Sequence, residues 1–108
     1  MANFKQEILA AAGGELIEAI SIGRFGDSEA FEVEKGAVPA ERLNQPVSWD
    51  EAAAWLDYDY DDGLGLAECH PIVAWTATRI LFVHEYDGST EVMWAPRHPT
   101  SIDQTRYL

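Results

Sequence analysis

The chain has 108 residues, 47% of them hydrophobic and 11% aromatic, so we expect one folded domain over residues 1–108. It carries 19 Asp and Glu against seven Lys and Arg, for a formal net charge of −12. This charge repels phosphate backbones and anionic lipid surfaces, which disfavours direct binding to nucleic acid or to membranes. The short apolar stretches, the N-terminus unlike a signal peptide and the single cysteine, Cys69, predict a cytoplasmic protein.

The first half of the chain begins with a well-marked helix. Asn3 and Gln6 have the spacing of an N-terminal capping box, and glycines stand at 13 and 14, so we expect a helix over Phe4–Ala12. Alternating apolar and polar residues predict a strand over residues 15–25, a turn at 26–28 and a second strand over residues 29–34. A connecting loop with two prolines should then run over residues 36–46.

A second capping box, formed by Ser48 and Glu51, begins the next predicted helix. Its apolar residues recur at helical spacing and should supply a buried face. They are Trp49, Ala52, Ala53, Trp55 and Leu56.

Three strand-like segments follow Pro71, over residues 72–76, 79–86 and 90–95. Asp87-Gly88 is typical of a two-residue type I′ hairpin turn, which sets the register of the last two strands. The expected pairs are Val83 with Val92, Phe82 with Met93, Leu81 with Trp94 and His84 with Glu91. Apolar residues then fall on both faces of this hairpin, so one face should pack under the helices and the other should be covered or serve as a contact surface.

The connections between these strands are too short for parallel crossovers and predict an antiparallel meander. The expected order is α-β-β-α-β-β-β, which defines an α+β domain. We therefore predict a four- or five-stranded antiparallel sheet with two helices packed on one face, followed by a polar C-terminal tail over residues 97–108.

The most distinctive segment is a run of carboxylates and tyrosines from Leu56 to Gly63. Arg79 is the single basic residue between positions 43 and 96, where ten acidic residues stand, so this part of the chain should project a negative field. In an extended chain the carboxylates would lie on one side and the tyrosines on the other, where they belong either to the core or to an interface. We predict a partner-binding face whose members are Asp57, Tyr58, Asp59, Tyr60, Asp61, Asp62, Asp50, Glu51 and Glu68.

The same segment suggests calcium as an alternative ligand. If Asp57 is position 1 of an EF-hand-like loop over residues 57–68, Asp59, Asp61 and Glu68 fall at ligand positions 3, 5 and 12. The glycine expected at position 6 comes one residue late, at Gly63, and Pro71 opposes an exiting helix. A solvated acidic loop is the competing interpretation, and we expect no cofactor.

Other residues that could carry chemistry lack a supporting pattern. Cys69 and His70 are neighbours, but adjacent side chains on an extended chain point apart, so they do not predict a nucleophile and base. His84 is better explained by a cross-strand pair with Glu91, and His98 stands in no metal-binding spacing. We therefore predict no catalytic residues and a binding protein rather than an enzyme.

By its size, its acidity and the run from Asp57 to Asp62, the chain resembles the small acidic inhibitors of phages and mobile elements. These are anti-CRISPR and antirestriction proteins that mimic DNA. It is similar in the same way to acidic immunity proteins that neutralise nuclease toxins. The resemblance implies an inhibitor or adaptor that docks on a basic, nucleic-acid-binding protein. The remaining alternative is that the acidity only keeps the protein soluble.

Overall fold

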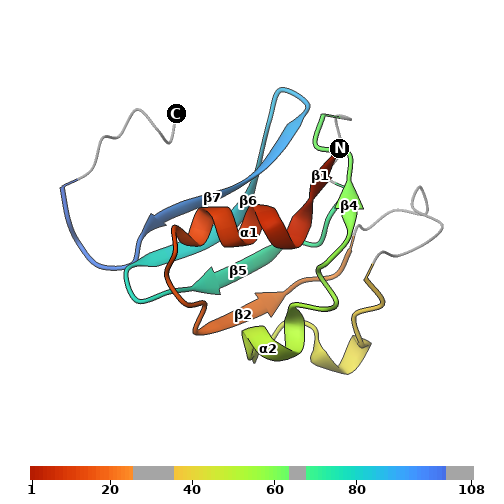
Figure 1. The fold of residues 1–108 in the computed structure, drawn as a ribbon, viewed down its shortest axis with the longest axis horizontal. Helices are drawn as coiled ribbons and strands as arrows, with labels where there is room; N and C mark the ends of the chain where they lie inside the picture. The colour runs from red at the N-terminus through yellow and green to blue at the C-terminus, as the bar shows by residue number, and fades with distance from the viewer. Residues whose placement is uncertain (26–35, 64–67, 102–108) are drawn as a thin grey trace.

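The computed structural model describes residues 1–25, 36–63 and 68–101, and these form the predicted α+β domain (Figure 1). The predicted turn at 26–28, the strand at 29–34 and most of the C-terminal tail lie outside the described residues. In chain order the elements are β1 (Ala2–Asn3), α1 (Phe4–Ala12), β2 (Ala19–Ile22), the 3-10 helix η1 (Ala40–Arg42), β3 (Pro46–Val47), α2 (Trp49–Ala52), β4 (Asp59–Tyr60), β5 (Ile72–Trp75), β6 (Arg79–Tyr86) and β7 (Ser89–Pro96).

Helix α1 has the predicted bounds and both predicted ends. The Asn3 side chain accepts a hydrogen bond of 3.0 Å from the Gln6 backbone N–H, which caps the first turn. Gly13 ends the helix with a φ of 62°, in the left-handed conformation that glycine adopts at low cost. One face of the helix is buried, including Phe4 and Ile8, so the helix is held to the sheet by its apolar stripe.

The main sheet has five antiparallel strands in the order β3-β2-β5-β6-β7. All four predicted pairs of the β6–β7 hairpin are present, because the turn has two residues as expected. Asp87 and Gly88 both have positive φ, 51° and 84°, which a type I′ turn requires. The meander predicted from the short connections is confirmed.

The two faces of this sheet differ. Ile20, Ala74 and Leu81 lie side by side across β2, β5 and β6 and are fully buried. Helix α1 crosses this face in Figure 1, and Ala52 of α2 and Leu56 join the same core. The opposite face carries Val73 beside Phe82 and is partly exposed, since Val73 keeps 38% of its surface accessible.

Several elements are shorter than the sequence pattern indicates. The strand expected over residues 15–25 is limited to β2, and before it Glu15 and Glu18 accept side-chain hydrogen bonds from Thr76 and Arg97. The second capped helix is real, with Ser48 accepting from the Glu51 N–H at 3.2 Å, but α2 has four residues and continues to Leu56 only as turns. The connection over residues 36–46 contains η1 and the first residue of β3. None of the described helices is long and apolar enough to cross a membrane.

Candidate functional site: an acidic surface and pocket

The acidic run is held against the N-terminus of the chain by a small second sheet that the sequence did not predict. Strand β4 pairs with β1, with Asn3 opposite Asp59 and Ala2 opposite Tyr60. The Phe4 backbone N–H extends this contact by donating to the Tyr58 carbonyl at 2.9 Å. The run is therefore extended over these residues and fixed to the first turn of α1.

Asn3 connects the helix cap to the carboxylates of the run. While its side-chain oxygen caps α1, its Nδ2 donates to Asp57 Oδ1 at 3.0 Å and to Asp59 Oδ1 at 3.3 Å. Both aspartates are exposed. They stand near the positive end of the helix dipole, where negative charge is favoured. Two exposed carboxylates are thus held in place by one neutral side chain.

The tyrosines alternate with the aspartates as predicted, but they face the core. Tyr60 is fully buried and packs edge-on against Phe4, with ring centroids 5.6 Å apart. Tyr58 is half-buried, and its hydroxyl is hydrogen-bonded to His70 Nδ1 at 2.8 Å and accepts from the His70 N–H at 2.9 Å. The expectation that Tyr60 contacts a partner through an exposed ring is therefore corrected, because the period-two alternation directs it inward.

Beyond β4 the run turns and meets the β6–β7 hairpin. Asp61 Oδ1 accepts from the Gly63 N–H at 2.9 Å, which stabilises the turn. The Asp62 carbonyl accepts from the Thr90 N–H at 2.7 Å, which ties the end of the run to β7. One backbone hydrogen bond thereby joins the end of the run to the hairpin.

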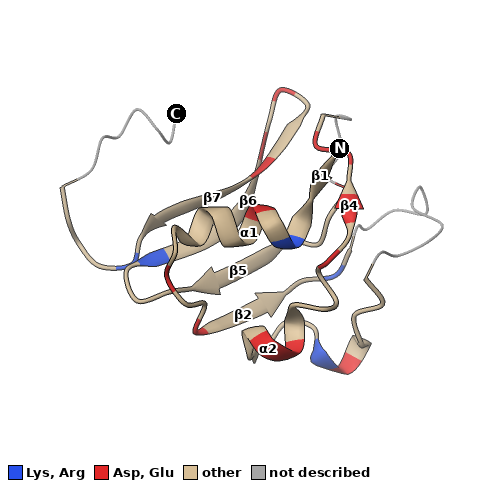
Figure 2. Ribbon diagram, viewed as in Figure 1, with Lys and Arg blue, Asp and Glu red and all other residues tan. Residues whose placement is uncertain are grey.

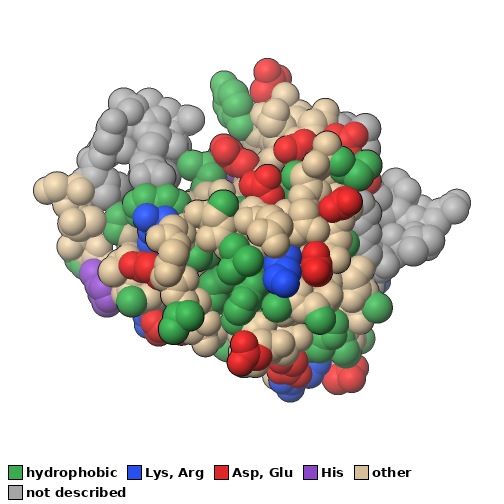
Figure 3. All heavy atoms as spheres, in the orientation of Figure 1, with side chains coloured by type: hydrophobic (Ala, Val, Ile, Leu, Met, Phe, Trp, Pro, Cys, Tyr) green, Lys and Arg blue, Asp and Glu red, His purple; other side chains and the backbone are tan. Residues whose placement is uncertain are grey.

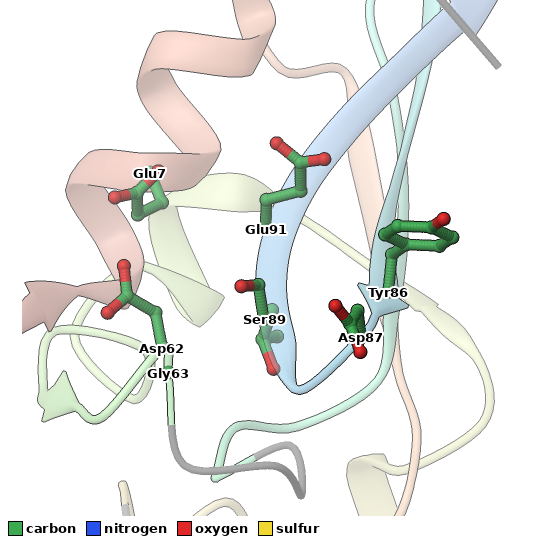
Figure 4. Close-up of a pocket in the computed structure, with 8 residues that line it drawn as sticks. Glu7, Asp62, Gly63, Tyr86, Asp87, Ser89 and Glu91 are labelled. Carbon is green, nitrogen blue, oxygen red and sulfur yellow. The ribbon is translucent and has the colours of Figure 1, made fainter. Parts of the chain in front are cut away.

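A pocket of about 580 Å³ lies between this end of the run, α1 and the hairpin (Figure 4). Glu7 and Asp62 lie on one side of it, and Glu91, Ser89 and Asp87 lie on the hairpin side. We call the group Glu7, Asp62, Asp87 and Glu91 with the space between them the acidic pocket. Within the described residues none of these four carboxylates forms a salt bridge. The pocket therefore carries four carboxylates whose charge is not neutralised by direct ion pairs.

The other predicted site residues are not all close to this pocket. The carboxylates of α2, Asp50 and Glu51, lie on the β2 side of the molecule, apart from those of β4 and the hairpin (Figure 2). Glu51 is also paired with Arg42 at 2.6 Å, so its charge is compensated. Glu68 is half-buried and follows residues outside the described part of the chain. The predicted face thus divides into two separate groups.

Figure 3 shows acidic side chains gathered in the upper part of the view, around the first half of α1 and the hairpin. We define the acidic surface as Asp57 and Asp59 together with the acidic pocket. Sequence reasoning did not assign Glu7, Asp87 or Glu91 to a site. The capped helix and the hairpin register were predicted. The pairing of β1 with β4, which places the acidic run beside the helix, was not predicted, because strands of two residues are too short to show an alternating pattern in the sequence.

For the calcium alternative, Asp59 belongs to β4 and residues 64–67 of the loop lie outside the described residues. Among the described residues, no three His, Cys, Asp or Glu lie close enough to share one metal ion. His84 lies opposite Glu91 in the hairpin as predicted, and Cys69 and His70 are both buried.

Comparison of the chain with protein-family models, with curated proteins and with solved structures found no match.

Proposed function

We propose that this protein binds a basic partner protein through the acidic surface, acting as an inhibitor or adaptor that occupies a nucleic-acid-binding site on that partner. The observation that carries the proposal is a set of exposed carboxylates that the fold holds in place. Asp57 and Asp59 are fixed by Asn3, and Asp62 is fixed through its backbone to Thr90. Fixed charges lose little freedom on binding, which favours affinity and specificity.

The basic residues of the described chain support the same conclusion by their positions. Arg79, the single basic residue between positions 43 and 96, donates to the Ala11 carbonyl at 2.8 Å and lies 3.9 Å from the ring of Trp94. Arg97 pairs with Glu18 at 3.0 Å. Lys5, although it is on α1, forms no salt bridge with the acidic surface in the described part of the chain. Within the described residues, the four carboxylates of the acidic pocket therefore keep their charge available for a partner.

Successive carboxylates on one side of a strand stand about 6–7 Å apart, which resembles the spacing of phosphates along a nucleic-acid strand. Asp57 lies just before β4 and Asp59 begins it, and the shared Asn3 Nδ2 donor holds these two exposed carboxylates about this close together. A groove of Lys and Arg that binds a phosphate backbone could engage them with the same side chains. This supports a nucleic-acid-binding protein as the partner.

The test measures binding of a fluorescent octa-arginine peptide to the intact protein at about 50 and 300 mM NaCl. We expect affinity to fall with salt, because the contacts are charge pairs exposed to screening. Asp57→Asn/Asp59→Asn should weaken binding at least fivefold at low salt. The matched control Asp50→Asn/Glu51→Gln removes the same formal charge from α2 and should change affinity less than twofold. Equal losses in the two variants, or an affinity that ignores salt, would show that no dedicated acidic surface exists.

A further inference from the structure

The outer side of the main sheet is apolar, although the described α-helices join the core on its other side. Helix α1 lies in front of the sheet in Figure 1, so the outer side is the far one in that view. Antiparallel sheets with one covered face commonly turn polar side chains to solvent on the other. Here the strand register instead places two mainly apolar rows of side chains there. We define the outer face as these nine residues, Ala19, Trp75, Ile80 and Ala95 in one row and Pro46, Ser21, Val73, Phe82 and Met93 in the next.

All nine residues of the outer face keep part of their surface accessible to solvent. Val73 is 38% exposed, whereas Ile20, Ala74 and Leu81, which alternate with the outer-face residues along their strands, are fully buried. The row that contains Val73 crosses all five strands of the sheet. A contiguous apolar surface of this kind on a folded domain is typical of an interaction site.

The charge pattern indicates which kind of molecule fits this face. Neither row contains a charged residue, although the chain has 19 Asp and Glu. On the same side of the sheet, His84 and Glu91 form the next row toward the hairpin turn. A basic partner finds no carboxylate to pair with in the two apolar rows. Two outer faces, in contrast, can meet without placing like charges opposite each other, so the pattern favours a second copy of this chain.

We propose that two copies of this chain pack with their outer faces together around a twofold axis, with the two sheets inside the dimer and the helices outside. Sheets that pack face to face keep their strand directions within about 30° of each other and interdigitate their side chains. A twofold contact uses the same surface of both copies, so the row through Val73 and Phe82 meets its own equivalent. This contact goes beyond the proposed function, because Asp57 and Asp59 lie at β4, which pairs with β1 in the second sheet. Each copy therefore keeps these two carboxylates accessible.

The size of the outer face sets the expected strength of the dimer. Five strands about 4.8 Å apart, and two rows of side chains about 7 Å apart along the strands, cover roughly 300–400 Å² on each copy. Permanent dimers bury about 800 Å² or more on each partner. The two copies should therefore associate weakly and reversibly, with a Kd in the micromolar range, rather than form a permanent dimer.

Analytical ultracentrifugation of the intact protein over about 5–500 µM tests the association. We expect the mean mass to rise from that of one chain toward that of two. Association should strengthen between about 50 and 300 mM NaCl, because salt screens the repulsion between two copies of net charge −12. A protein that stays monomeric at about 500 µM and 300 mM NaCl would overturn the proposal. A dimer that salt weakens would overturn it too, since charge pairs and not the outer faces would then join the copies.

Val73→Glu/Met93→Glu locates the contact, because it places four carboxylates between the two copies. The dimer should weaken at least tenfold. The matched control Leu9→Glu/Leu16→Glu adds the same charge at apolar residues that are 36% and 89% exposed and lie outside the outer face. It should change the Kd less than threefold, and equal losses in the two variants would contradict the assignment.

A measurement on the parent protein needs no substitution in the sheet. Methyl resonances of Val73, Ile80 and Met93 are followed by NMR as the protein is diluted from about 500 to 5 µM in 300 mM NaCl. They should shift with concentration, since these side chains leave a contact, while those of Leu9 and Leu16 stay constant. Shifts at the two leucines without shifts on the outer face would show that the copies meet elsewhere.

Discussion

The carboxylates at the two ends of helix α1 have different fates. Beyond its C-terminal end, Glu15 accepts hydrogen bonds from Thr76 Oγ1 at 2.6 Å and from Thr78 Oγ1 at 2.7 and 2.9 Å, and Glu18 pairs with Arg97. At its N-terminal end, the carboxylates of the acidic pocket have no ion-pair partner among the described residues. Figure 2 shows the same division, with basic residues where β6 begins and β7 ends, and acidic residues around the hairpin turn.

This difference separates structural from functional charge. A carboxylate that is bonded to the fold contributes to stability but offers a partner little. A carboxylate without a hydrogen bond or ion pair contributes less to stability, limited for Glu7 to its place in the first turn of α1, yet its charge remains available for binding. Two results would contradict this distinction. One is that substitutions near the C-terminal end of α1 leave stability unchanged, and the other is that substitutions in the acidic pocket lower it.

The largest expected effect is that of Arg79→Met. Arg79 donates to the Ala11 carbonyl, which belongs to the last turn of α1, and it stacks on Trp94. Loss of a charged hydrogen bond and a cation–π contact should lower the free energy of unfolding by about 2–3 kcal/mol. Urea denaturation measures this loss. Arg24→Met, at an exposed position, removes the same charge and should change stability by less than about 0.5 kcal/mol.

Two adjacent glycines at the C-terminal end of α1 test the contact between Arg79 and this helix. Gly13 and Gly14 both have positive φ, 62° and 87°, so alanine is strained at either position, by about 1 kcal/mol. A Cβ on Gly13 would also overlap the Arg79 guanidinium, whereas one on Gly14 meets nothing within 4 Å. Gly13→Ala should therefore be less stable than Gly14→Ala by about 1 kcal/mol in urea denaturation. Equal stability of the two variants would mean that the hydrogen bond from Arg79 to Ala11 does not require the guanidinium to lie against Gly13.

The contribution of Glu15 to stability should depend on pH. Hydrogen bonds from Thr76 and Thr78 lower the pKa of Glu15 in the folded protein. A lowered folded-state pKa means that its contribution is fully present above the pKa of the unfolded chain, about 4.3, and is lost as pH falls through the folded-state value. Glu15→Gln should therefore lower the melting temperature at pH 7, and the difference from the parent should shrink below about pH 4. A difference that is constant from pH 7 to pH 3 would contradict this role.

The sequence predicted the parts of this molecule that depend on neighbouring residues. The capping of α1 by Asn3 and the hairpin register set by Asp87-Gly88 follow from local geometry, and both are confirmed. The alternation of Asp59 and Tyr60 was also predicted, but which side faces the core depends on β1, 56 residues earlier in the chain. The acidic pocket depends on three such distant segments, and for this reason its members were not predicted.

The smallest expected effect is that of neutralising the acidic pocket. Glu7→Gln/Asp62→Asn/Glu91→Gln removes three charges that have no ion-pair partner in the described structure, so no ion pair is broken and no charge is left unpaired. The melting temperature at low salt should change little, because relief of repulsion offsets the loss of the Glu7 charge from the first turn of α1, and any rise should disappear as salt is added. Glu15→Gln changes one carboxylate, whereas the pocket variant changes three. A larger loss of stability in Glu15→Gln would therefore show that the hydrogen bonds of a carboxylate, and not the number of charges removed, determine the change in stability. A clear loss of stability in the triple variant would mean that the pocket carboxylates hold the hairpin to α1, and the division between the two ends of the helix would then be wrong.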